Sequence, residues 1–132
     1  MNEILEFLQR CKTYYIATIE NNEPRIRPFG TIDIFDGHLT IQTGKVKDVS
    51  KQIHINPNIS ICAFDGNEWI RINAKAIEDE RIEAAEHMLE QYPSLLPMYK
   101  AGDGNCEIFK LVDVKATISG FGAPTRQIEL WV

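Results

Sequence analysis

Two arginines near residue 26 have the types and spacing that an anion-binding site needs. They belong to the segment Pro24-Arg25-Ile26-Arg27-Pro28-Phe29-Gly30. On a strand, Arg25 and Arg27 point to the same face, because side chains alternate along a strand. The two prolines cannot donate to a sheet ladder, so this strand should lie at an edge or an opening. Two guanidinium groups beside unpaired backbone amides suit a phosphate or a planar polar ring. The alternative is a solvated surface pair, which is the commoner position for charged residues.

A second candidate anion site is the segment Thr43-Gly44-Lys45-Val46-Lys47, where an expected strand leads into an expected helix. Helix N-termini offer unpaired N–H groups and a positive dipole, which together favour phosphate. Thr43 would supply a hydroxyl, and Lys47 or Lys51 a positive charge. The segment is not a Walker motif, because Val46 follows Gly44-Lys45 where Ser or Thr is required. The alternative is a loop with solubilising lysines.

Trp69 is the third candidate, at the start of an expected strand. Alternation places Trp69, Arg71 and Asn73 on the face opposite Ile70 and Ile72. The tryptophan is therefore either ordinary partly buried packing, or an aromatic wall for a flat ligand or a subunit contact. No side chain stands in a recognisable general acid, base or nucleophile pattern, so no catalytic residue is predicted.

Composition limits the classes of protein that fit. The 132 residues suit one domain over residues 1–132. Fourteen Lys and Arg against nineteen Asp and Glu give a net charge of -5, which argues against a general nucleic-acid binder. No apolar run approaches the roughly 18 residues of a membrane span. The N-terminus MNEILEFLQRCK lacks the basic region of a signal peptide, so we expect a cytoplasmic protein.

Residues that could ligate soft metals are scattered along the chain. The cysteines and histidines are Cys11, Cys62, Cys106, His38, His54 and His87. None forms a CxxC, an HExxH or a mixed zinc-ligand spacing, so no metal site is predicted. Three widely spaced cysteines are instead typical of small buried side chains in a reducing compartment.

Hydrophobic periodicity predicts an antiparallel β protein with few helices. Strands are expected over residues 14–19, 25–35, 39–43, 59–64 and 69–77, with one or two strands in 106–121 and a terminal strand over 127–132. Helices are expected over residues 3–11, from Val46 to the Asn56-Pro57 stop, and over 82–92, with a short helical turn in 94–100. The resulting fold class is mainly β (α+β): a small barrel or closed sheet of six or more antiparallel strands, with about three helices outside.

The dipeptide Asp36-Gly37 suits a type I′ turn, because both central residues of that turn need positive φ. A hairpin at this turn would join the arginine strand directly to the strand that ends at Thr43. Both candidate anion sites would then flank one pocket.

The order and spacing of these segments resemble the pyridoxamine 5′-phosphate oxidase-like family of FMN-binding split β-barrels. The likeness rests on Arg25 to Pro28, on the block Thr43, Lys51 and Asn56-Pro57, and more weakly on residues 68–72. It implies a homodimer with FMN at its interface. The segment matching residues 25–30 would lie along the isoalloxazine and ribityl groups. Thr43, with Lys47 or Lys51, would hold the phosphate, and the position of Trp69 would lie near the flavin, often from the other subunit.

The resemblance also suggests which branch of the family to expect. The name-giving enzyme has a C-terminal Arg-x-His segment, which residues 126–132 lack. The chain is more similar to the small, general members, some of which resemble nitroimidazole reductases. The implied activity is FMN-dependent oxidoreduction of a small organic substrate, with NADH or NADPH as candidate donors. The alternative is a binding or sensing module for FMN, haem or another flat cofactor.

Overall fold

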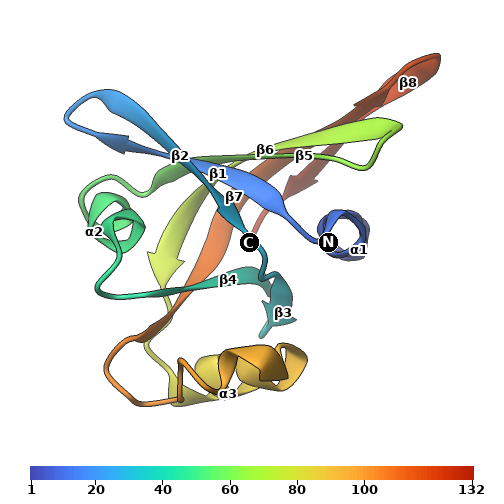
Figure 1. The fold of residues 1–132 in the computed structure, drawn as a ribbon. Coiled ribbons are helices and arrows are strands. Elements are labelled where there is room, and N and C mark those ends of the chain that lie inside the picture. Colours follow the sequence, from blue (N-terminus) through green and yellow to red (C-terminus); the bar gives the residue numbers. More distant parts are fainter.

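Eight antiparallel strands form one sheet in the computed structural model, which describes residues 1–132 (Figure 1). The strands are β1 (Tyr14–Glu20), β2 (Glu23–Phe29), β3 (Asp33–Phe35), β4 (His38–Gly44), β5 (Asn58–Phe64), β6 (Glu68–Glu78), β7 (Cys106–Gly120) and β8 (Ala123–Leu130). Their order across the sheet is β2-β1-β5-β6-β7-β4-β3, and β8 also pairs with β7. The predicted fold class, a split β-barrel with a few peripheral helices, is confirmed.

Three α-helices connect or flank the strands. They are α1 (Asn2–Cys11), α2 (Asp48–Ile55) and α3 (Ile82–Gln91), and a short 3₁₀ turn, η1 (Pro93–Leu95), follows α3. Helix α2 packs against β1, β4 and β6. In Figure 1, α3 lies under β3 and β4, at the opposite end from the tip of β8. None of these helices has both the length and the apolar character that crossing a membrane would require.

The core lies inside the curved sheet because alternate residues of its strands are apolar. Ile59, Ile61 and Ala63 of β5 point inward while their neighbours are exposed, and β6 follows the same pattern. Helix α1 adds Ile4 and Phe7 to this core of 22 buried residues. A separate, smaller cluster of four residues lies between α3 and β7. Period-two burial therefore fixes which face of β5 and β6 is available for function, whereas β4 is buried on both faces.

The stretch 25–35, predicted as one strand, is two strands separated by residues 30–32. Two tyrosine hydroxyls replace the sheet ladder at this break. Tyr14 donates to the carbonyl of Thr31 at 2.6 Å, and the Tyr92 hydroxyl bonds both the N–H and the carbonyl of Ile32 at 3.0 Å. The backbone can leave the sheet without losing its hydrogen bonds, because these side chains satisfy them.

The break moves the two halves of the predicted strand to opposite ends of the sheet order. The predicted type I′ turn is present, with φ of 50° at Asp36 and 78° at Gly37, but it joins β3 to β4. The prediction that this hairpin joins the arginine strand to the strand ending at Thr43 is therefore wrong. Strand β2 pairs with β1 alone, which confirms the edge position predicted from Pro24 and Pro28.

The C-terminal strands also differ from the prediction. Residues 106–120 form one strand of 15 residues whose early part pairs with β4 and whose later part pairs with β8. Strand β8 begins at Ala123, four residues earlier than predicted, after a turn in which Gly122 has φ of 80°. The positive φ at Gly122 allows this tight reversal of the chain. The mixed composition of residues 121–126 does not predict that a strand begins there.

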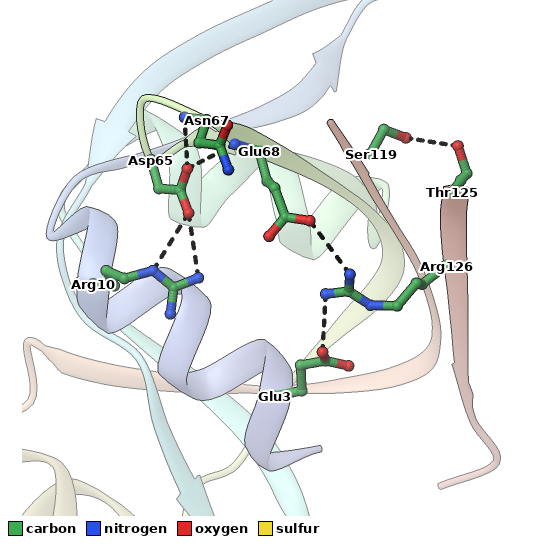
Figure 2. A network of polar contacts seen from close by, with 8 residues as sticks. All are labelled: Glu3, Arg10, Asp65, Asn67, Glu68, Ser119, Thr125 and Arg126. Atoms are coloured by element: carbon green, nitrogen blue, oxygen red, sulfur yellow. Dashed lines mark hydrogen bonds and ion pairs between the residues drawn. The ribbon is translucent and has the colours of Figure 1, made fainter. Parts of the chain in front are cut away.

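Figure 2 shows how the N-terminal helix is attached to the β5–β6 turn and to β8. The guanidinium of Arg10 contacts the Asp65 carboxylate at 3.3 Å, and Asp65 also accepts the N–H groups of Asn67 and Glu68 at 2.8 and 2.7 Å. Arg126 of β8 bridges Glu68 and a glutamate in the first turn of α1. The backbone hydrogen bonds to the Asp65 carboxylate, more than the arginine, lower its pKa below the ordinary value of 3.8.

This lowered pKa predicts an acid-sensitive contribution to stability. The contribution of Asp65 is fully present above about pH 4 and is lost as pH falls through its folded-state pKa, below 3.8. Urea denaturation between about pH 5 and pH 2.5 should show Asp65→Asn less stable than the wild type at the upper end, with the gap closing as pH falls. Asp113→Asn is the control, because Lys75 is the only ion-pair partner of Asp113, at 3.9 Å. If the stability difference between the wild type and Asp65→Asn does not change with pH, the acid sensitivity does not come from ionisation of Asp65.

Candidate functional site

Arg27 is the most firmly held of the predicted site residues. One guanidinium nitrogen donates to the Thr18 hydroxyl at 2.8 Å and to the Ile16 carbonyl at 3.2 Å, and the other donates to Gln52 Oε1 at 2.6 Å. Burial lowers the pKa of Arg27, and the nearby carboxylates of Asp48 and Glu20 oppose that shift. The guanidinium remains charged at neutral pH, so this corner of the molecule holds a fixed, oriented cation.

Gln52 of α2 is the partner that positions Arg27. The Thr18 hydroxyl donates to Gln52 Oε1 at 2.5 Å, and Gln52 Nε2 donates to Glu20 Oε2 at 3.3 Å. The side chains of Thr18 and Gln52 are buried, although both residue types are usually exposed. Helix α2 is thus linked by hydrogen bonds to the β1–β2 hairpin.

Both predicted anion elements contribute to one cavity of about 300 Å³ between this hairpin and α2, which we call the arginine cavity. Its lining includes Arg25 and Arg27 from β2 and Lys47 immediately before α2. Arg25 forms ion pairs with Glu20 and Glu23 at 3.3 and 3.2 Å. The predicted meeting of the two elements therefore occurs, but α2 brings it about, not the β3–β4 hairpin.

Two carboxylates share the arginine cavity, Glu20 and Asp48. Among the lining residues the cations Arg25, Arg27 and Lys47 outnumber these carboxylates by one, and Glu23, which pairs with Arg25, lies outside the lining. The N-terminus of α2 has no side-chain cap, so its first N–H groups lack a side-chain acceptor. A surplus cation and free N–H groups at one helix end suit an anionic ligand.

The remaining predicted residues do not line this cavity. Thr43 is buried in β4 opposite Glu107 of β7, and Lys51 is exposed on α2. Pro28 is exposed, Phe29 packs on Tyr14 with ring centroids 6.0 Å apart, and Gly30 lines a different cavity beside Lys12 and Tyr92. Trp69 packs edge-on against Phe121 at 5.4 Å, on the face of the sheet opposite the core. A single chain brings together three of the nine predicted binding residues.

A larger cavity of about 710 Å³, which we call the outer-face cavity, was missed by sequence reasoning. It lies on the side of the sheet away from the core, where strands β1, β2, β5, β6, β7 and β8 contribute to it. Its polar or charged lining residues include Asn58, Ser60, Asn73, Lys75 and Lys115. In the sequence, strand alternation assigns each of these residues to the solvent-facing side of its strand, so none of them indicates a cavity. No local signal indicates that β8 ends beside them, where Leu130 and Trp131 complete the wall.

The sequence matches the family model described as pyridoxamine 5′-phosphate oxidase over residues 1–112. This chain belongs to the pyridoxamine 5′-phosphate oxidase family. The match covers α1 and strands β1 to β6 completely, together with α2, α3 and the start of β7. It therefore includes the arginine cavity but not β8. The sequence matches none of the curated proteins with which it was compared.

Solved structures of the pyridoxamine 5′-phosphate oxidase fold agree with this assignment. A NimC/NimA family protein from Clostridium acetobutylicum superposes with a TM-score of 0.95 at 34% identity, over 98% of this chain and 92% of that one. General stress protein 26 from Bacillus anthracis gives a TM-score of 0.71 at 18% identity, over 96% and 97% of the two chains. HutZ, the haem storage protein from Vibrio cholerae, gives a TM-score of 0.62 at 17% identity, over 83% of this chain and 87% of that one. The last two show the fold alone.

The different surroundings of the two arginines predict different costs of removal. Arg27→Met keeps most of the apolar stem but leaves Gln52 Oε1 and the Ile16 carbonyl without a charged donor, which should cost about 2 kcal/mol in the free energy of unfolding. Arg25→Met is the matched control, since exposed ion pairs are worth less than about 1 kcal/mol. Urea denaturation of both variants measures the difference. Equal losses would show that Arg27 is not the anchored member of the pair.

Proposed function

We propose that this protein is an FMN-binding flavoprotein that transfers electrons or hydride to or from a small organic substrate. Family membership supports an FMN site, and the observation that carries the assignment to this chain is the arginine cavity. There Arg25, Arg27 and Lys47 meet at the uncapped N-terminus of α2. The three cysteines are free, but none is buried as predicted, since Cys11 and Cys106 are half-buried and Cys62 is exposed. Free cysteines support a reducing compartment, and we propose a cytoplasmic location.

The donor set of the arginine cavity fits a phosphate group. Lys47 would contribute a mobile charge and α2 its free N–H groups, while Arg27 is already oriented by Gln52 and Thr18. FMN supplies the redox chemistry when it is bound, because its ring accepts and returns electrons. The protein residues would bind and orient the cofactor, and Arg27 would do so without reorganising, because Thr18 and Gln52 already hold it.

The outer face supports a homodimer as the working form. Register places Tyr15 of β1, Ile26 of β2 and Phe64 of β5 on this face, and all three are exposed. Exposed aromatic and aliphatic side chains on neighbouring strands are typical of a surface that a partner covers. Trp69 lies opposite Phe64 on the same face, so a second copy docked there would place Trp69 at the subunit interface. This arrangement would explain why Trp69 is remote from Arg27 within one chain.

The cofactor proposal predicts a phosphate-specific effect of Lys47. The purified protein should bind FMN with a shifted flavin absorbance that bleaches on adding dithionite. Lys47→Ala should weaken FMN by about tenfold, the value of one lost charge contact, and riboflavin much less, because riboflavin lacks the phosphate. Lys51→Ala is the matched control, since Lys51 lies outside the arginine cavity. Fluorescence titration measures both affinities.

Two outcomes of that titration would contradict the assignment. Equal losses of affinity for FMN and for riboflavin in Lys47→Ala would show that the phosphate does not bind in this cavity. A selective loss of FMN affinity in Lys51→Ala would place the phosphate beside Lys51 of α2 instead. If the purified protein does not bind FMN at all, it shares only its fold with flavoproteins. Saturable oxidation of NADH or NADPH by the FMN-loaded protein would distinguish an enzyme from a binding module.

Haem binding is the second candidate. Two structures with the same fold are described as a haem storage protein from Vibrio cholerae and a haem-binding protein from Mycobacterium smegmatis. Titration with haemin in the same spectrophotometer tests this alternative. A saturable Soret band, with no flavin binding, would favour haem over FMN.

The dimer proposal is tested by charging the outer face. Ile26→Glu should shift the protein from dimer to monomer in size-exclusion chromatography with light scattering, because a buried carboxylate at an apolar interface is costly. Ile26 is 70% exposed in the single chain, and Met98→Glu, at 68% exposure in the segment after η1, is the matched control. A monomeric wild type, or no effect of Ile26→Glu, would overturn this choice of interface.

A further inference from the structure

Three side chains that are distant in sequence converge beside the C-terminal end of α2. His54 belongs to α2, Glu78 ends β6 and Glu107 lies near the start of β7. The His54 Nε2 atom lies 2.7 Å from Glu107 Oε2 and 3.6 Å from Glu78 Oε1, and one ligand atom from each residue falls within 4.8 Å of the others. No spacing in the sequence predicts this cluster, because β6, β7 and α2 meet only in the folded sheet.

The other oxygen of each carboxylate is already held by a separate donor. The Ser50 hydroxyl donates to Glu107 Oε1 at 2.5 Å, and the ammonium of Lys45 lies 3.2 Å from Glu78 Oε2. Each glutamate therefore presents one oxygen to the imidazole and has its second oxygen oriented by a neighbour. Outer donors of this kind fix the direction of metal ligands in established sites.

The charge at Glu107 is a second observation, independent of these distances. Its side chain has no exposed surface, and neither a lysine nor an arginine forms an ion pair with it. Its two partners are the hydroxyl of Ser50 and the imidazole of His54. Buried carboxylates are normally paired with a full positive charge or bound to a metal. Nε2 of an imidazole carries at most one hydrogen, so it cannot donate fully to both facing carboxylates.

We propose that His54, Glu78 and Glu107 bind a divalent first-row transition metal ion, with Zn²⁺ as the best fit. One imidazole nitrogen and two carboxylate oxygens are ligands of zinc at about 2.0–2.2 Å, whereas Mg²⁺ and Ca²⁺ take oxygen ligands. Tetrahedral zinc would separate these ligand atoms by about 3.3 Å, close to the spacings around His54 Nε2. A cation between these three side chains would replace the Nε2 hydrogen that faces both carboxylates, and it would neutralise the buried charge of Glu107.

The site would have three protein ligands and a route for a fourth. His54 is 46% exposed, and it lines, with Glu78, a cavity of about 470 Å³. A water molecule from this cavity could complete the coordination. The ring of His54 packs against Phe109 with centroids 5.5 Å apart, which limits its rotation. The ion would join α2 to β6 and β7 on the side where Ser50 and His54 project, away from Gln52 and the arginine cavity.

The test is a metal titration of tag-free, chelator-treated full-length protein. Isothermal calorimetry with Zn²⁺ should give one site per chain, and Co²⁺ should give the visible bands of a low-symmetry, four-coordinate ion. His54→Asn should weaken Zn²⁺ by more than about 100-fold, since loss of outer-shell partners alone costs 10–100-fold. His87→Asn is the matched control, because His87 contacts a single buried carboxylate, Asp33, at 2.5 Å. It should leave the affinity unchanged.

Two further measurements separate metal binding from the flavin proposal and from misfolding of a variant. Zn²⁺ should raise the melting temperature of the wild type and not that of His54→Asn, in FMN-free and FMN-treated samples alike, so failure of the flavin proposal would not affect the outcome. Glu78→Gln, on a half-buried residue, should also lose binding and replaces His54→Asn if that variant fails to fold. Absence of stoichiometric Zn²⁺ and Co²⁺ binding to the wild type would overturn the proposal. So would an equal loss in His87→Asn.

Discussion

The hydrogen bond from Arg27 to Gln52 Oε1 is the contact on which the arrangement of the site depends. Strand β2 is an edge with one neighbour, and an edge strand rich in proline has little of its own to hold it in place. Gln52 accepts from both β1 and β2, so the helix replaces the neighbour that the split sheet lacks. The same helix contacts β7 through Ser50. Helix α2 therefore links β1 and β2 to β7, and its ends face two different polar clusters.

Much of the fold follows from period and turn chemistry alone. Alternation predicts β5 and β6, Asp36-Gly37 predicts the turn between β3 and β4, and Pro24 and Pro28 predict that β2 lies at an edge. The break after Phe29 could not be predicted, because its hydrogen bonds come from Tyr14 and Tyr92, which are distant along the chain. Long-range partners of the backbone leave no local pattern.

The candidate site was predictable to the extent that its residues are adjacent in sequence. Charge type and strand spacing identify Arg25 and Arg27, and a strand-to-helix junction identifies Lys47. Thr43 fits the same motif but points into packed structure in β4. The outer-face cavity and the cluster of His54, Glu78 and Glu107 are assembled from six and three elements respectively, so only the tertiary fold reveals them.

The change of partner along β7 has a consequence for the outer-face cavity. The family match ends at residue 112, and β7 begins to pair with β8 at Val114. The second half of β7 still belongs to the barrel, because it pairs with β6 and contributes Val114, Ala116 and Ile118 to the core. Strand β8 pairs with β7 alone and lies at the margin of the sheet (Figure 1). With Trp131 after it, β8 contributes Glu129 and Leu130 to one wall of the outer-face cavity. The shape and polarity of that wall therefore depend on the tail of the chain, whose residues line neither the arginine cavity nor the cavity beside His54.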